Sequence, residues 1–234
     1  AASDVYKRQF YEMFFEDAEL VSKELELTLT GKNCGMEERA PMCGIPYHAV
    51  EGYLNKLVAN GHKVAICEQV EDPKLAKGLV RREVIRIVTP GTNLDMQALD
   101  ESKNNYIMCI VYLADRYGVS IADVSTGDYY VTEVDSERKL FDEITKFSPS
   151  EIICNESFYM SGVDIEDLRH RLKITIYALE TWYFGDELAE TTLLTHFKVK
   201  SLEALGLADY DCGMIAAGAL LKYCLLYTSP SPRD

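Results

Sequence analysis

The chain has 234 residues, of which 47% are hydrophobic and 26% charged, a balance that argues against disorder and allows two compact domains. Its formal net charge of −14 argues against a protein that coats DNA by bulk attraction, because such binding grows with the phosphates that lysine and arginine neutralise. Residues 10–92 hold 10 basic and 13 acidic side chains, whereas residues 93–223 hold 11 and 23, so the net charges are −3 and −12. The two halves are therefore expected to have different partners.

Seven scattered cysteines, odd in number and without a C-x-x-C pair or a close Cys/His cluster, favour buried free thiols over a metal site. No run approaches the ~18 apolar residues that cross a bilayer, and no leader pattern opens the chain. We therefore expect a cytoplasmic protein without a membrane partner and without a bound metal.

The two ends differ from the sequence between them. Residues 1–9 and 224–234 show neither helical nor strand periodicity and resemble translated adaptor sequence. We expect both to be foreign or artefactual tails, and the segment from Phe10 to Tyr223 to be part of a longer protein.

The first half predicts alternating strands and helices. In EDAELVSKELEL, Ala18, Val21 and Leu25 recur at helical spacing behind an acidic first turn. TLTGKNCG predicts a short strand, and PMCGIPYHAV, with two prolines and a glycine, predicts a tight connection. A second helix is expected over about residues 48–59. HKVAICEQV and REVIRIVTPGT predict strands joined by a polar loop, which would complete a small α/β layer.

The second half predicts another α/β domain. Residues 93–103 lack a pattern and are expected to form a linker. YIMCIVYLADRYGVSIADVSTGDYYVTEV predicts three strands separated by two turns, hence a meander. A helix from Glu137 to Phe147, a buried strand EIIC and further elements through CGMIAAGALLKYC complete the domain.

Aromatic side chains and carboxylates alternate in QFYEMFFEDAEL. Phe10, Tyr11, Phe14 and Phe15 can simply fill a core. Alternatively, a phenyl ring can enter a base stack from the minor groove and kink the duplex. Glu12 bears on this choice, because a carboxylate repels phosphates and is useful beside DNA where it accepts a hydrogen bond from a base edge.

A basic stretch, PKLAKGLVRREVIR, stands out in this acidic chain. The stretch contains one acidic residue, Glu83, and five basic residues, which are Lys74, Lys77, Arg81, Arg82 and Arg86. The stretch is either a solvated loop or a patch that positions a DNA backbone, for which Lys74, Lys77, Arg81 and Arg82 are the candidates.

Three carboxylates in the second half, Asp115, Asp123 and Asp128, invite comparison with a two-metal nuclease site. Such a site needs carboxylates that converge at strand ends, but the strand YIMCIVYL carries none in its interior. Solvated turn residues are the favoured interpretation. The chain also lacks the glycine-rich and histidine motifs of nucleotide sites and hydrolases, so no catalytic residue is predicted.

Several long strings together resemble the amino-terminal part of the MutS family of DNA mismatch-repair proteins. They are FYEMFFEDA, PMCGIPYHAVEGYLNKLVANGHKVAICEQVEDP, VIRIVTPGT, GVSIADVSTGDYYVTE and AAGALLKY, in family order. The resemblance implies an α/β fold of two small domains. Residues 10–92 would be a mixed-sheet mismatch-recognition domain, and residues 104–223 a connector domain similar to RNase H.

The resemblance also implies roles for two residues. In the family's F-Y-E motif the phenylalanine stacks on the mispaired or unpaired base and the glutamate hydrogen-bonds to it, roles that fall on Phe10 and Glu12. Tyr11 would point the other way on an extended strand and pack inward. The family's Gly-Asp pair before this motif is replaced here by Arg8-Gln9.

Partners and cofactors are likewise implied by the resemblance. They are double-stranded DNA with mismatches or small loops, and a MutL-like protein that binds the connector. The whole protein would be a homodimeric DNA-dependent ATPase that uses ATP and magnesium near the bacterial nucleoid, whereas this part would be no enzyme and hold no cofactor. Two alternatives are a metal-dependent nuclease on the RNase H-like domain and a MutS relative that acts on recombination intermediates. Phe10 and Glu12 argue against the second alternative, because such relatives commonly lack the F-Y-E motif.

Overall fold

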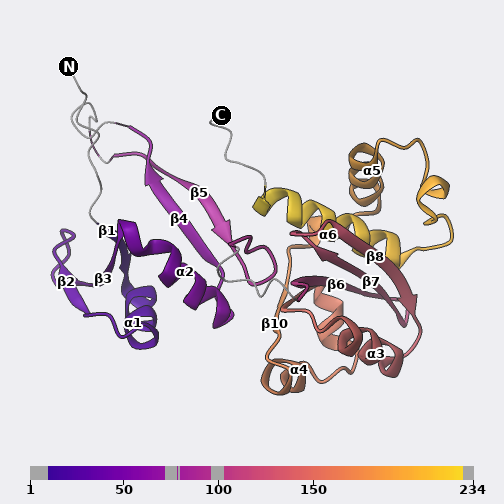
Figure 1. Cartoon of the computed structure of the whole chain (residues 1–234), viewed down its shortest axis with the longest axis horizontal. Helices are drawn as coiled ribbons and strands as arrows, with labels where there is room; N and C mark the ends of the chain where they lie inside the picture. Colours follow the sequence, from indigo (N-terminus) through magenta and orange to yellow (C-terminus); the bar gives the residue numbers. More distant parts are fainter. Residues whose placement is uncertain (1–9, 72–77, 79, 96–102, 229–234) are drawn as a thin grey trace. The chain divides into compact units, whose positions relative to one another are not determined.

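The computed structural model describes residues 10–71, 78, 80–95 and 103–228. Contacts within the chain divide it into two compact units, residues 1–64 and 65–234, which are described separately (Figure 1). The predicted domain boundaries at residues 92 and 104 stay predictions.

The first unit is a three-stranded antiparallel sheet with two helices. The sheet has the order β1-β3-β2, so β3 is central. One face of β3 packs on the first helix, where Cys43 contacts Ala18 and Val21 in a small core that Leu57 completes. The elements are β1 (Phe10–Phe14), α1 (Phe15–Glu24), β2 (Thr30–Lys32), β3 (Ala40–Pro46), a 3-10 turn (Tyr47–Ala49) and α2 (Val50–Ala59).

The prediction of a tight connection in PMCGIPYHAV was wrong, because this stretch forms the central strand β3. Pro41 and Pro46 lie next to or at the strand ends, where a missing N–H interrupts the ladder least. Between them, Cys43 and Ile45 alternate into the core. Burial of these side chains outweighs the turn preference of proline and glycine.

The prediction that all the early strands form one layer was also wrong. β4 (Val64–Gln69) and β5 (Arg82–Val88) pair with each other in a separate two-stranded sheet. Their arrows run in opposite directions in Figure 1. Pairing two strands that are close in sequence costs less loop-closure entropy than inserting them into a distant sheet.

The larger sheet of the second unit is mixed and has the order β10-β9-β6-β7-β8. The predicted meander is confirmed as the antiparallel strands β6 (Tyr106–Leu113), β7 (Arg116–Asp123) and β8 (Asp128–Val134). β9 (Glu151–Cys154) and β10 (Thr175–Ala178) add parallel to β6. The fold class of two small α/β domains is thereby confirmed, whereas the likeness of the second domain to RNase H stays a prediction. The three-stranded sheet of the first unit is antiparallel rather than mixed as predicted.

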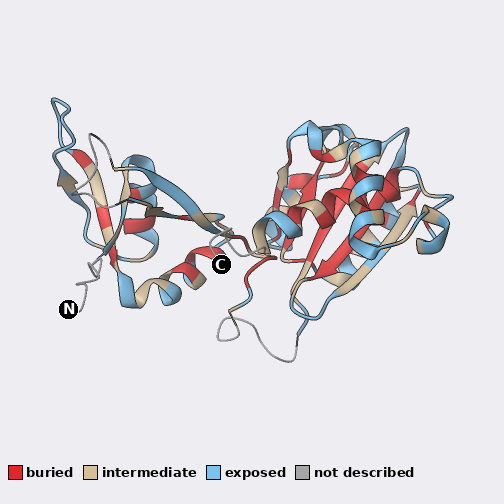
Figure 2. Cartoon of the chain, turned by 90° about the horizontal axis from the view of Figure 1, so that it is seen from above, coloured by how far each residue is buried: buried red, intermediate tan, exposed pale blue. Residues whose placement is uncertain are grey.

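Helices cover both faces of this sheet. Alternate residues of β6 enter two cores, Met108 and Ile110 on one side and Ile107 and Cys109 on the other. Figure 2 shows buried positions concentrated in the centre of this unit. The helices are α3 (Glu137–Phe147), α4 (Ile165–Arg171), α5 (Asp186–Phe197) and α6 (Cys212–Thr228), with 3-10 turns at Glu156–Met160, Thr181–Phe184 and Leu202–Leu205.

Two of these helices bear directly on the sequence predictions. α3 has the predicted bounds, with the Ser136 hydroxyl accepting the Lys139 N–H at its start and Ser148 left-handed at its end. α6 is largely apolar, with Lys222 as its one charged residue, and it continues to Thr228, beyond the predicted domain end at Tyr223. It approaches β7 so closely that a Cβ at Gly118 would lie 2.1 Å from the Cys212 carbonyl oxygen. In the described part of the chain, no helix is long and apolar enough to cross a membrane.

Candidate nucleic-acid interface

Strand β1 presents different side chains on its two faces. Tyr11 and Met13 point toward the core side, where the Tyr11 ring stacks on Tyr47 at 5.5 Å between centroids and Met13 packs against the core. Phe10 and Glu12 occupy the other face, because side chains alternate along a strand. Tyr11 thus lies on the face opposite Phe10, as expected, although it is half-buried and stacks on the exposed Tyr47 instead of packing within the small core.

The Phe10 side chain is 54% exposed, so it is not a core residue here. Phe10 pairs with Pro46 and Glu12 with Gly44 on β3. A Cβ at residue 44 would lie 3.5 Å from Phe10 Cδ1, so the ring rests over a position that carries no side chain. One side of the ring is supported by the sheet, and much of the rest is free for another molecule.

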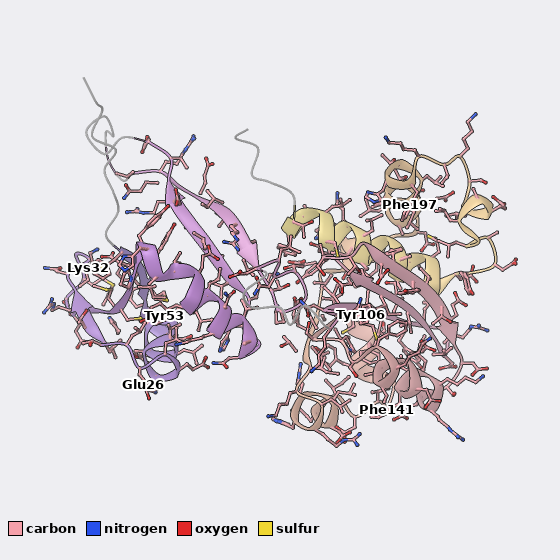
Figure 3. The ribbon with its side chains drawn as sticks, viewed as in Figure 1. Glu26, Lys32, Tyr53, Tyr106, Phe141 and Phe197 are labelled. Carbon is pink, nitrogen blue, oxygen red and sulfur yellow. The ribbon has the colours of Figure 1, made fainter. Side chains whose placement is uncertain are left out.

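Glu12 is held by a cation from the third strand of the sheet. Lys32 Nζ on β2 lies 2.5 Å from Glu12 Oε2 and 5.6 Å from the centroid of the Phe14 ring. The Glu12 and Lys32 side chains are 35% and 46% exposed. Phe10, Glu12, Phe14 and Lys32 thus form one surface, which we call the Phe10 face (Figure 3 labels Lys32).

The predicted basic patch is only partly within the described residues, since Lys74 and Lys77 lie outside them. Arg81 forms an ion pair with Glu83 at 3.1 Å, which offsets part of its charge. The exposed Arg82 donates to the Val80 carbonyl oxygen at 3.4 Å. The backbone-contact assignments of these four cations stay predictions.

The three carboxylates considered for a nuclease do not all converge: Asp123 and Asp128 are register partners at one end of the β7–β8 ladder, but Asp115 lies at the other end of β7. Asp115 precedes β7 and Asp123 ends it, and an eight-residue strand separates its ends by roughly 20 Å. Asp115 accepts the Tyr112 hydroxyl at 2.8 Å, whereas Asp128 accepts the Asn104 side chain at 3.2 Å. Within residues 10–71, 78, 80–95 and 103–228, no group of three or more His, Cys, Asp or Glu side chains could hold a metal ion.

Asp123 is buried rather than solvated as predicted. One oxygen accepts the Ser125 N–H at 2.9 Å and its hydroxyl at 2.6 Å, and the other accepts the Asn105 N–H at 2.9 Å. Burial raises the pKa of Asp123, but these hydrogen bonds outweigh burial and leave the pKa below its ordinary value. The carboxylate therefore stabilises the turn between β7 and β8.

The sequence reasoning missed the buried Glu151, whose side chain is 0% exposed. Oε2 accepts the Thr89 hydroxyl and the Gly91 N–H, both at 2.7 Å, and Oε1 accepts the Tyr223 hydroxyl at 2.7 Å and the Tyr177 hydroxyl. We call these five residues the Glu151 cluster. The signal that the sequence offered was a glutamate at the start of the otherwise apolar strand EIIC, because a buried carboxylate needs hydrogen-bond donors.

The Glu151 cluster also perturbs its tyrosines. Burial raises the pKa values of Tyr177 and Tyr223, and the neighbouring Glu151 carboxylate raises them further. Both hydroxyls therefore remain protonated donors to the carboxylate. The cluster connects the segment after β5, which holds Thr89 and Gly91, with strands β9 and β10 and with helix α6. Its role is therefore structural.

Taken together, these features define a two-domain α/β protein whose first unit presents an exposed aromatic and acidic face. The family model described as MutS domain I matches residues 5–97, and that of MutS domain II matches residues 105–230. The chain therefore belongs to the MutS family, as the sequence resemblance predicted.

Individual relatives agree with this assignment. The chain is 64% identical over 214 residues to the DNA mismatch repair protein MutS of Lachnoclostridium phytofermentans. It is 48% and 49% identical over 217 residues to the proteins of the same name from Ruminiclostridium cellulolyticum and Acetivibrio thermocellus. Each comparison covers 92% of this chain but only 23%, 24% and 25% of the respective relatives. The chain thus spans about a quarter of the length of these proteins.

Proposed function

We propose that this chain is the mismatch-recognition and connector part of a DNA mismatch-repair protein. The observation that carries the proposal is the placement of Phe10 and Glu12 on one exposed face of β1. Phe10 would enter the base stack from the minor groove at a mispaired or unpaired base, and Glu12 would accept a hydrogen bond from that base. The names of the relatives, DNA mismatch repair proteins, support the same function.

The physics of the duplex explains how such a face can select mismatches. Unstacking a base step costs a few kcal/mol, and the cost is lowest where the base is mispaired or unpaired. An aromatic wedge must unstack a base step wherever it inserts, so it binds tightest where stacking is already weak. One ring and one hydrogen bond also require no particular sequence, which suits a sensor of many different mispairs.

Contacts to the DNA backbone would come from cations outside the Phe10 face. We assign this role to Lys74, Lys77, Arg81 and Arg82, because lysine and arginine neutralise phosphates without reading bases. The net charge of −3 over residues 10–92, against −12 over residues 93–223, favours the first half for this contact.

The acidic second half would instead serve a protein partner, a MutL-like protein that binds the connector. We propose no catalytic step for this chain. The whole protein would be a homodimeric ATPase at the bacterial nucleoid, and ATP with Mg²⁺ would be its cofactors.

The test places residues 10–223 of this chain in the full-length L. phytofermentans protein, in exchange for its own segment. Binding of a duplex with one unpaired T, and of one with a G·T mispair, is compared with binding of the fully paired duplex at fixed salt. We expect a preference of at least about tenfold, equivalent to about 1.4 kcal/mol, which is less than unstacking costs.

Phe10→Ala should abolish this preference and leave the weak binding of paired DNA unchanged. The matched control is Phe197→Ala, which removes a partly exposed phenylalanine of α5 in the second unit. The proposal is overturned if Phe10→Ala retains the preference, or if both variants reduce it equally.

A further inference from the structure

A lysine on a different strand is paired with the carboxylate of the Phe10 face. Lys32 ends β2, and Glu12 lies on β1, with β3 between them. The Nζ–Oε2 distance is 2.5 Å, although 20 positions of sequence separate the two residues. The pair therefore exists because the sheet places β1 and β2 on opposite sides of β3.

This pair is poorly suited to stabilising the fold. Both side chains are partly exposed, and ion pairs in contact with water contribute little to folding because solvent screens them. The pair does, however, constrain the carboxylate. Lys32 occupies Oε2, whereas Oε1 has no hydrogen-bond partner among the residues that the structure describes.

A carboxylate on a DNA-binding surface faces a specific difficulty, since the phosphates repel it. A cation within ion-pair distance offsets this repulsion, and one such pair in water changes an equilibrium constant by about fivefold. The ring of Phe14 gives the ammonium a second attraction on the same face, which favours its position beside Glu12.

We propose that Lys32 is a positioning residue that sets mismatch discrimination by holding Glu12. Lys32 fixes Oε2 and offsets the carboxylate charge, so that Oε1 accepts the hydrogen bond from the mispaired or unpaired base next to Phe10. This inference rests on the proposed function. Lys32 acts through Glu12 and contacts neither the base nor the wedge.

The experiment is a double-mutant cycle in the full-length graft described above. The variants are Lys32→Met, Glu12→Gln and the combination, and the duplexes are the unpaired-T and fully paired ones over a series of salt concentrations. Lys23→Met is the matched control, because it removes an exposed lysine from α1, the helix that packs on the opposite face of β3. Thermal unfolding of each variant checks that the fold is kept.

Lys32→Met should lower the preference for the unpaired-T duplex by about three- to tenfold. Binding of the paired duplex and its salt dependence should remain unchanged. In the Glu12→Gln background, Lys32→Met should have no further effect, because the charge that it offsets has been removed. Lys23→Met should leave the preference as it is.

Two results overturn the proposal. If Lys32→Met weakens both duplexes equally and lowers the salt slope by about 0.9, then Lys32 contacts a phosphate directly. If the preference is unchanged, Lys32 has no role in discrimination. Phe10→Ala distinguishes a failure of this inference from a failure of the proposed function. If Phe10→Ala loses the preference while Lys32→Met keeps it, only the role of Lys32 is refuted.

Discussion

Two glutamates of this chain occupy opposite environments. Glu12 on the Phe10 face is partly exposed and has one cationic partner, whereas Glu151 is buried and accepts hydrogen bonds from four residues. A buried carboxylate without donors would be strongly destabilising, so its donors must be supplied by the fold. An exposed carboxylate can still accept hydrogen bonds from another molecule. The contrast shows that exposure and unused hydrogen-bonding capacity, rather than residue type, distinguish a glutamate that is available to another molecule from a structural one.

The largest expected effect is from breaking the Glu151 cluster. Glu151→Ala leaves several buried donors without an acceptor and should lower the free energy of unfolding of the second unit by about 3–5 kcal/mol. Urea unfolding of the 234-residue chain is followed by the fluorescence of Trp182, the one tryptophan, which lies in this unit. Glu156→Ala, at an exposed glutamate, is the control and should change stability by less than about 0.5 kcal/mol. A loss below about 1 kcal/mol in Glu151→Ala would contradict the structural role.

Glycines near the two carboxylates sharpen the same contrast. A Cβ at Gly91 would lie 2.7 Å from Ile107 Cβ and 2.9 Å from Glu151 Oε2, so Gly91→Ala should cost about 1–3 kcal/mol by overpacking. A Cβ at Gly44 would make ordinary contacts, the nearest at 3.5 Å from Phe10. Gly44→Ala should therefore change stability by less than about 1 kcal/mol. Urea midpoints of the two variants provide the measurement, and equal losses would be inconsistent with the two environments.

Two phenylalanines give the same contrast between the core and the exposed Phe10 face. Phe158 is fully buried, so Phe158→Ala should cost about 3 kcal/mol or more. Phe10→Ala removes a ring that is already about half in water and should cost less than about 1 kcal/mol. Thermal unfolding followed by circular dichroism measures both. If Phe10→Ala destabilised the chain as much as Phe158→Ala, Phe10 would be a core residue.

The smallest expected effect concerns an ion pair of the first unit. The Glu24 carboxylate accepts a hydrogen bond from the His62 ring at 2.8 Å. Burial raises the pKa of Glu24, but the hydrogen bonds from His62 and Asn60 outweigh burial and leave that pKa below its ordinary value. A lowered folded-state pKa stabilises the fold above the unfolded value of 4.5, and this contribution disappears as the pH falls through the folded value. Glu24→Gln should flatten the decline in stability between about pH 5 and pH 3. An unchanged acid profile would show that the pair contributes nothing.

Much of the candidate site was predictable because it depends on local pattern. The alternation of Phe10, Tyr11 and Glu12 follows from the period of a strand, once the stretch is extended. The face also required that β1 lie at a sheet edge with α1 on the other side, which no short pattern reports. Lys32 was not predicted, because its partner Glu12 is distant in sequence and lies on β1, which is not paired directly with β2.

By itself, the sequence determined the elements whose signals are local. The meander β6–β8 and the bounds of α3 follow from periodicity, turn residues and capping within short windows. The family resemblance rests instead on several long matching strings of the sequence. The tertiary structure alone decided that the proline-bearing stretch is the central strand β3, that β4 and β5 form their own sheet, and that Glu151 is paired with donors up to 72 positions away. These outcomes depend on burial and on partners that are distant in sequence, which local propensity does not encode.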